Sequence, residues 1–148
     1  MMLITAMIGT LGFCLLFKIK RDKIIYGVIG GTISTVIYLI CIQAGMDLFI
    51  QNFIPTVVAT IYTEIIARVV KAPTTVFLFP AIIPLTPGGS LYYTMRAIVD
   101  GNMAEAKTVG KQTMVIALGI ALGVLLVSLV FSRFSYKKEQ TNTRFTKK

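Results

Sequence analysis

The chain contains no histidine, no tryptophan and only two cysteines in 148 residues. Without histidine it lacks the commonest general base and metal ligand of proteins. The two cysteines, Cys14 and Cys41, lie far apart in apolar runs and do not have the spacing of metal ligands. These absences argue against an enzyme, and they predict a protein with no metal site and no cofactor.

Charged residues are also scarce, at 14% of the chain against about 25% in an ordinary soluble domain. Hydrophobic residues make up 55%. A soluble protein of this size cannot bury so much apolar surface, because much of the surface of a small domain must face water. The composition therefore predicts an all-α integral membrane protein that is embedded in the lipid bilayer. The excess of 15 Lys and Arg over 6 Asp and Glu is then a signal of membrane topology, and we expect no nucleic acid as a partner.

Five apolar runs are candidates for membrane spans, which need about 20 residues and at least about 17. They are residues 1–17, 24–42, 48–67, 74–99 and 113–131. Together they predict five transmembrane helices within a domain over residues 1–132, followed by a basic cytoplasmic tail over residues 133–148. The first run has no basic residue before it, so we interpret it as a retained helix and not as a cleaved signal peptide.

The basic residues are distributed unevenly among the predicted loops. If the N-terminus lies outside, only Arg96, Lys107 and Lys111 are external, and the other twelve of the 15 are cytoplasmic. Cytoplasmic loops of membrane proteins carry such an excess of Lys and Arg. The distribution therefore predicts a multi-pass protein of the plasma membrane with its N-terminus outside and its C-terminus in the cytoplasm.

The fourth run is interrupted by Pro80, Pro84 and Pro87. A proline inside a helix removes a backbone donor and clashes with the carbonyl group four residues earlier. Three prolines in eight positions predict a helix break near the bilayer midplane. Thr86 then resembles the N-cap of a second half-helix, and Pro87 resembles a first-turn proline. The alternative is a structural kink whose freed backbone groups are satisfied by neighbouring helices.

The start of this second half-helix is a candidate substrate site. Its unpaired N–H groups and the positive end of its dipole suit a carboxylate. Irregular backbone at this depth is tolerated only where it is buried in protein or lines a wet cavity. Two glycines leave room for a ligand, and hydroxyl groups flank them. The candidate substrate-binding residues are Thr86, Pro87, Gly88, Gly89, Ser90, Tyr92 and Arg96.

Three polar residues each have two interpretations. Arg96 can attract an anionic substrate or extend to the outer lipid headgroups. Tyr92 can contact a substrate or anchor its helix at the membrane interface. Glu64 is the only acidic residue inside a predicted span, which makes it a candidate for proton coupling. It also lies four residues before Arg68, a spacing that allows an ion pair.

Two glycine pairs have the Gly-x-x-x-Gly spacing, Gly27 with Gly31 and Gly119 with Gly123. Such small-residue spacings let two helix backbones approach closely inside a membrane. They predict helix contacts within this chain or with a partner.

The segment Pro84-Leu85-Thr86-Pro87-Gly88-Gly89 resembles the Pro-x-x-Pro-Gly-Gly segment of the threonine/serine exporter family. The length and the predicted five spans resemble the small component of the two-component form of that family, and the resemblance covers most of the chain. It implies export of small hydrophilic metabolites, which are threonine and serine in some members and dicarboxylates such as succinate in others. It also implies a larger membrane subunit of the same family as a partner.

We therefore expect a five-helix subunit of a secondary exporter of threonine, serine or small carboxylates, working with a larger membrane partner. Two other functions stay open. One is a non-transporting scaffold subunit of the membrane, in which the proline break is a packing feature. The other is a homo-oligomeric channel, which conducts ions without substrate saturation.

Overall fold

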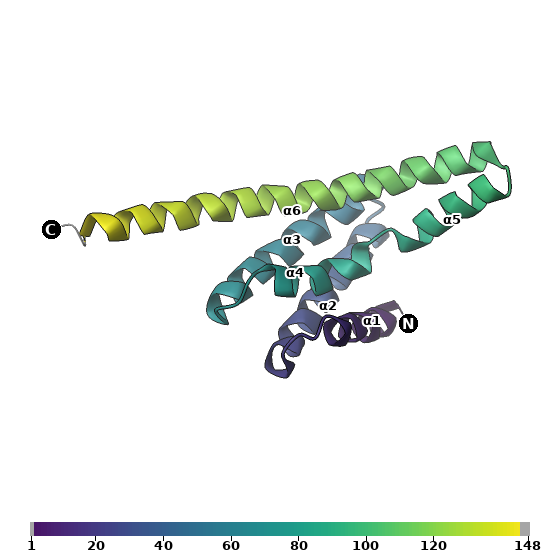
Figure 1. The fold of residues 1–148 in the computed structure, drawn as a ribbon. Coiled ribbons are helices and arrows are strands. Elements are labelled where there is room, and N and C mark those ends of the chain that lie inside the picture. The colour runs from purple at the N-terminus through teal and green to yellow at the C-terminus, as the bar shows by residue number, and fades with distance from the viewer. Residues whose placement is uncertain (1, 146–148) are drawn as a thin grey trace.

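A computed structural model of the protein describes the backbone of residues 2–145 and the side chains of residues 3–133. All regular structure in this range is helical, which confirms the predicted all-α class (Figure 1). The elements in chain order are α1 (Met2–Leu16), α2 (Arg21–Gln43), α3 (Leu48–Val69), α4 (Thr75–Ile82), the 3-10 helix η1 (Ile83–Leu85), α5 (Gly88–Val99) and α6 (Met103–Phe145).

Three helices and one bent helix pair are long and apolar enough to cross a membrane. The three helices are α2, α3 and the part of α6 up to Arg133, and the pair joins α4 and η1 to α5 at a bend of 56°. The other apolar helix, α1, has 15 residues, which is fewer than the about 17 that a span needs. The described residues thus contain three to four candidate spans, and the predicted count of five is not confirmed.

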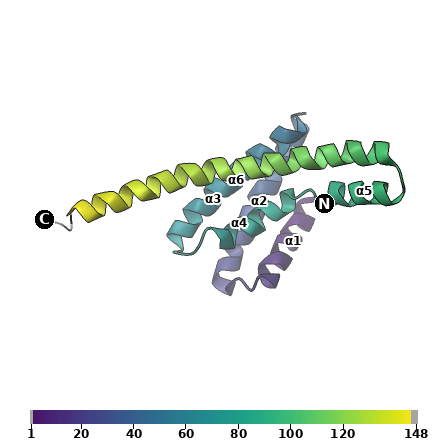
Figure 2. The same ribbon diagram turned by 45° about the horizontal axis from the view of Figure 1, so that its top comes forward.

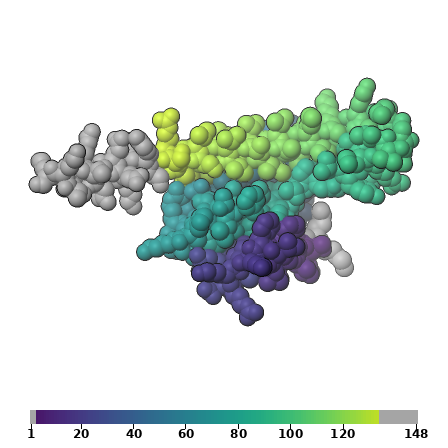
Figure 3. Space-filling view, in the orientation of Figure 1, coloured from purple at the N-terminus to yellow at the C-terminus, as the bar shows by residue number. Residues whose placement is uncertain are grey.

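Helices α1 to α4 form a bundle, and α6 lies across it on α3 (Figures 1 and 2). Helix α5 leaves the bundle after η1, and the first part of α6 runs back along it. In the space-filling view, this α5–α6 hairpin extends past the bundle (Figure 3). The broken span therefore has two unlike halves, because α4 packs inside the bundle and α5 packs on α6.

The first glycine pair lies where α1 contacts α2. A Cβ atom on Gly31 would lie 2.5 Å from Oγ1 of Thr10, and one on Gly27 would lie 2.9 Å from Sγ of Cys14. Thr10 and Cys14 are both fully buried. The predicted close contact is confirmed, and it runs antiparallel, since the later residue of α1 meets the earlier residue of α2.

The second glycine pair lies where α6 contacts α3. A Cβ atom on Gly119 would lie 3.0 Å from the carbonyl oxygen of Phe49, and one on Gly123 would lie 3.0 Å from Cβ of Thr56. This contact is also confirmed. Because the residue numbers of both helices increase together along the contact, α3 and α6 run parallel.

Helix α6 is longer than the predicted span of residues 113–131, because it begins at Met103. Its start is capped by Asn102, whose Oδ1 accepts a hydrogen bond from the N–H of Glu105 at 3.3 Å. The Glu105 carboxylate in turn accepts one from Nδ2 of Asn102 at 2.9 Å. This reciprocal cap starts the helix in polar residues before the apolar run.

The predicted basic tail, residues 133–148, continues α6 as far as Phe145. The side chains of residues 134–148 lie outside the described part of the chain, as do residues 146–148 altogether. Met1, on which the predicted outer N-terminus rests, also lies outside it.

Candidate functional site

The helix break predicted in the fourth run is present, but only two of its three predicted prolines lie in it. Pro80 lies inside α4 without ending it, Pro84 lies in the first turn of η1, and Pro87 directly precedes α5. The backbone becomes extended at Thr86, with φ −63° and ψ 135°. A residue that directly precedes a proline disfavours the helical backbone region, because the proline ring clashes with the backbone of that residue. The break therefore spans residues 83–87.

The cap of the second half-helix differs from the prediction. Helix α5 begins at Gly88 with Pro87 as its N-cap residue, and no side chain caps it. The Thr86 hydroxyl donates instead to the carbonyl oxygen of Ile83 at 2.6 Å. The predicted N-cap role of Thr86 and the first-turn place of Pro87 were thus wrong. The carbonyl oxygen of Ile83, the first residue of η1, thus accepts hydrogen bonds from both the N–H and the hydroxyl group of Thr86.

Two backbone donors at the start of α5 have no hydrogen-bond partner among the described residues. They are the N–H groups of Gly89 and Ser90. The Gly88 N–H donates to the carbonyl oxygen of Thr86 at 2.8 Å, and Pro87 has no N–H. A Cβ atom built on Gly88 or Gly89 would meet no atom within 4 Å. The turn therefore presents two N–H groups on an open surface, an arrangement that suits an anion.

Tyr92 and Arg96 lie farther along α5 and are not gathered around this turn. Tyr92 is exposed, and its ring makes an edge-to-face contact with Tyr93. Nε of Arg96 lies 3.5 Å from a carboxylate oxygen of Asp100, one helical turn later. Eight residues separate Gly88 from Arg96, which is about 12 Å along the helix. The structure thus separates the predicted site into the turn and the far end of α5.

Glu64 and Arg68 form an ion pair, with 2.7 Å between Oε2 and Nη1. The Arg68 guanidinium also lies over the ring of Phe131 on α6, 4.7 Å from its centroid. The Glu64 side chain is only 13% exposed. The geometry therefore supports the interpretation in which Glu64 forms an ion pair with Arg68. The contact of Arg68 with Phe131 then joins α3 to α6.

A cavity of about 430 Å³ adjoins the first part of the break, between α1, α2 and η1. Its volume lies in the range of small-molecule sites, which is about 300–1,000 Å³. Four hydroxyl side chains face Ile83 and Pro84 across it: Thr5, Thr10, Thr35 and Tyr38. The Thr10 and Thr35 hydroxyls donate to carbonyl groups of their own helices, and both side chains are buried. The accessible hydroxyl groups of the cavity are therefore those of Thr5 and Tyr38.

The chain matches the family described as Threonine/Serine exporter, ThrE, over residues 2–130. It belongs to this family. The match includes the whole of the broken span, and it confirms the resemblance carried by Pro84–Gly89. The threonine/serine exporter family is one of membrane exporters and not of enzymes. No curated protein and no solved structure matches the chain.

The cavity lined by hydroxyl residues in this member of the threonine/serine exporter family was missed by sequence analysis. Its residues come from three separate apolar runs, and of them only Pro84 belongs to a motif. The available signal was the presence of hydroxyl side chains inside apolar spans. That signal does not show which hydroxyl groups share a cavity, because this depends on how α1, α2 and η1 pack.

Proposed function

We propose that the protein is one subunit of a secondary exporter of threonine, serine or small carboxylates such as succinate, and that it works with a larger membrane subunit. The observation that carries this proposal is the pair of unpartnered N–H groups at Gly89 and Ser90. They lie at a break in an apolar helix, and broken helices with such half-helix ends are a recurring binding arrangement in secondary transporters. In this proposal, the turn of residues 86–90 holds the carboxylate of the solute.

An amino-acid substrate also needs acceptors for its ammonium group. The cavity next to Ile83 and Pro84 supplies them as the hydroxyl oxygens of Thr5 and Tyr38, since Thr10 and Thr35 are buried. The donors thus lie on the break itself, and the acceptors lie on α1 and α2 beside its first part. We propose that a zwitterion uses both parts and that a dicarboxylate depends mainly on the turn. Arg96, at the far end of α5, attracts the anionic solute or extends to the headgroups, and Tyr92 anchors the helix.

Proton coupling through Glu64 is an alternative role for the only acidic residue in a predicted span. Its ion pair with Arg68 accounts for the carboxylate without such a role. If Glu64 is coupled to transport, a proton gradient should drive export in the wild-type protein but not in Glu64→Gln. If a proton gradient drives export equally in the wild-type protein and in Glu64→Gln, Glu64 has no role in coupling.

The requirement for a partner is tested by transport into or out of lipid vesicles. We expect vesicles that hold both subunits to move labelled threonine or succinate with saturable kinetics, and vesicles that hold this chain alone to move neither. The reason is that the break leaves polar backbone that needs cover within the membrane. Saturable transport by the chain alone would contradict the partner, and ion conductance without saturation would favour the channel. A pair that assembles without transporting would favour the scaffold.

We infer five crossings, with α1 as a short first span and the bent pair as the fourth. The antiparallel contact of α1 with α2 and the parallel contact of α3 with α6 both suit this arrangement. We expect a membrane-impermeant maleimide to label Val99→Cys in intact cells, since this side chain is 85% exposed near the predicted outer loop. It should label Lys147→Cys only after permeabilisation. The native cysteines are buried and supply the low background. External labelling at residue 147 would rule out five crossings.

A further inference from the structure

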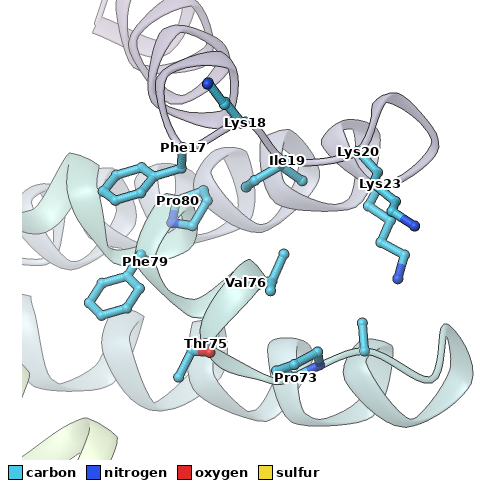
Figure 4. A pocket seen from close by; sticks show the side chains of 11 residues that line it. Phe17, Lys18, Ile19, Lys20, Lys23, Pro73, Thr75, Val76, Phe79 and Pro80 are labelled. Atoms are coloured by element: carbon cyan, nitrogen blue, oxygen red, sulfur yellow. The ribbon is translucent and has the colours of Figure 1, made fainter.

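A second cavity, of about 390 Å³, opens where the α1–α2 and α3–α4 connections meet the start of α4 (Figure 4). Its wall is mainly apolar. The rings of Phe17 and Phe79 stack there with centroids 6.3 Å apart and planes within 10° of parallel. Both side chains are more than half exposed, at 57% and 53%. This groove therefore offers an open apolar surface at one end of the bundle.

Three lysines also line the groove, namely Lys18, Lys20 and Lys23. Figure 4 shows the ammonium groups of Lys20 and Lys23 directed into the gap between the start of α2 and Pro73, whereas Lys18 points away from it. None of the described side chains that line the groove is acidic. Within residues 3–133, the three lysines form no ion pair. Two uncompensated positive charges thus lie beside an apolar wall.

The two connections that border the groove carry further positive charge. Each has a lysine in the left-handed backbone region two residues after a helix ends, Lys18 with φ 51° and Lys71 with φ 50°. Glycine is the usual residue at such a position, because a side chain there costs about 1–2 kcal/mol. Both turns therefore hold a lysine where glycine would be less strained. This places four lysines around one end of the bundle.

The combination of apolar wall and lysines selects among anions. A threonine or serine zwitterion needs an acceptor for its ammonium group, and the lining side chains include no carboxylate. A small dicarboxylate would leave the Phe17 and Phe79 rings without contact. A phospholipid supplies both a phosphate for the lysines and acyl chains for the rings. Basic pockets between membrane helices on the cytoplasmic side bind anionic headgroups, and this is the predicted cytoplasmic end.

We propose that this groove binds an anionic phospholipid of the cytoplasmic leaflet. Its phosphate lies between Lys20 and Lys23, and an acyl chain lies along Phe17 and Phe79. The bound lipid covers the start of α4, which is the first half of the broken span. This site is separate from the turn of residues 86–90, so it does not depend on the identity of the exported solute.

The test measures binding of phosphatidylglycerol to the purified chain in neutral detergent by native mass spectrometry. A lysine near an anionic headgroup contributes about 1 kcal/mol, so the double variant Lys20→Gln, Lys23→Gln should bind roughly 30-fold more weakly. Lys20→Arg, Lys23→Arg keeps the charge and should bind as the wild type does. The matched control, Arg21→Gln with Lys107→Gln, removes the same charge from residues that do not line the groove, and should change binding less than about 2-fold.

Three results would overturn the proposal. The first is unchanged binding in the Lys20→Gln, Lys23→Gln variant while it melts like the wild type. The second is an equal loss in the control variant, which would indicate general attraction to positive charge. The third is displacement of phosphatidylglycerol by inorganic phosphate or succinate at equal concentration, which would assign the groove to soluble anions. Weak binding of phosphatidylcholine beside strong binding of phosphatidylglycerol is the expected pattern.

Discussion

Replacing Gly89 by valine should weaken the apparent affinity for the exported solute roughly 10- to 150-fold, and Gly88→Val should act in the same direction. The added side chain blocks the approach of a carboxylate to the N–H groups of Gly89 and Ser90. Loss of a hydrogen bond to a charged group costs about 1.5–3 kcal/mol, which corresponds to this range. The measurement is the concentration dependence of export in vesicles that hold both subunits.

The structure indicates that these variants should still fold. A Cβ atom on either glycine meets no atom within 4 Å, and neither glycine has a positive φ. Gly12 supplies a matched control, because it is also helical and its Cβ would also meet open space. Gly12→Val should therefore leave the affinity unchanged. Ser90→Ala should have a smaller effect than Gly89→Val, since the backbone donors remain.

Unchanged affinity in both the Gly88 and Gly89 variants, at normal expression and with the partner bound, would show that the turn is only a kink. The substrate site would then have to be sought at the hydroxyl-lined cavity, at Glu64 or in the partner. Loss of the partner from both variants would instead show that the open glycine surface is a subunit contact. Co-purification with the larger subunit separates these outcomes.

Replacing Gly31 by alanine should lower the free energy of unfolding by about 1–3 kcal/mol, the usual cost of overpacking a close contact. The new Cβ atom would lie 2.5 Å from Oγ1 and 2.7 Å from Cγ2 of Thr10. Thr10 has little room to move, because it is fully buried and its hydroxyl donates to the carbonyl oxygen of Ala6 at 2.7 Å. Helix α1 must therefore shift away from α2. Thermal unfolding in detergent measures the loss.

A second substitution on the facing helix makes this prediction specific. Thr10→Ala removes both clashing atoms and leaves only the Cβ atom, at 3.1 Å. The double variant should therefore be more stable than the two single losses predict, by about 0.5–3 kcal/mol of coupling. Gly9→Ala is the control on α1, since its Cβ would meet no atom within 4 Å. If the losses of stability in Gly31→Ala and Thr10→Ala simply add in the double variant, this would contradict the packing of α1 against α2.

The sequence by itself determined the features that depend on short-range chemistry. Low charge and long apolar runs require a membrane protein whose backbone groups bond internally, and helices achieve this. Pro84 and Pro87 end the first half of the span, because a missing N–H and a ring clash act on the nearest turns, whereas Pro55 and Pro80 lie inside helices. The Gly-x-x-x-Gly spacings also predicted close helix contacts, because small residues at this spacing let two helix backbones approach. The cap of α5 was not predictable, since the Thr86 hydroxyl donates back to the carbonyl oxygen of Ile83 and its oxygen accepts from no N–H of α5.

Only the tertiary structure decided which residues share a site. The hydroxyl cavity joins α1 and α2 to η1, and the lysine groove joins two connections that are about fifty residues apart in sequence. The Glu64 spacing allowed an ion pair, but the packing of α6 on α3 placed Phe131 beside it. Cavities and contacts of this kind arise between elements, and their composition depends on helix directions and crossing points that no single apolar run encodes.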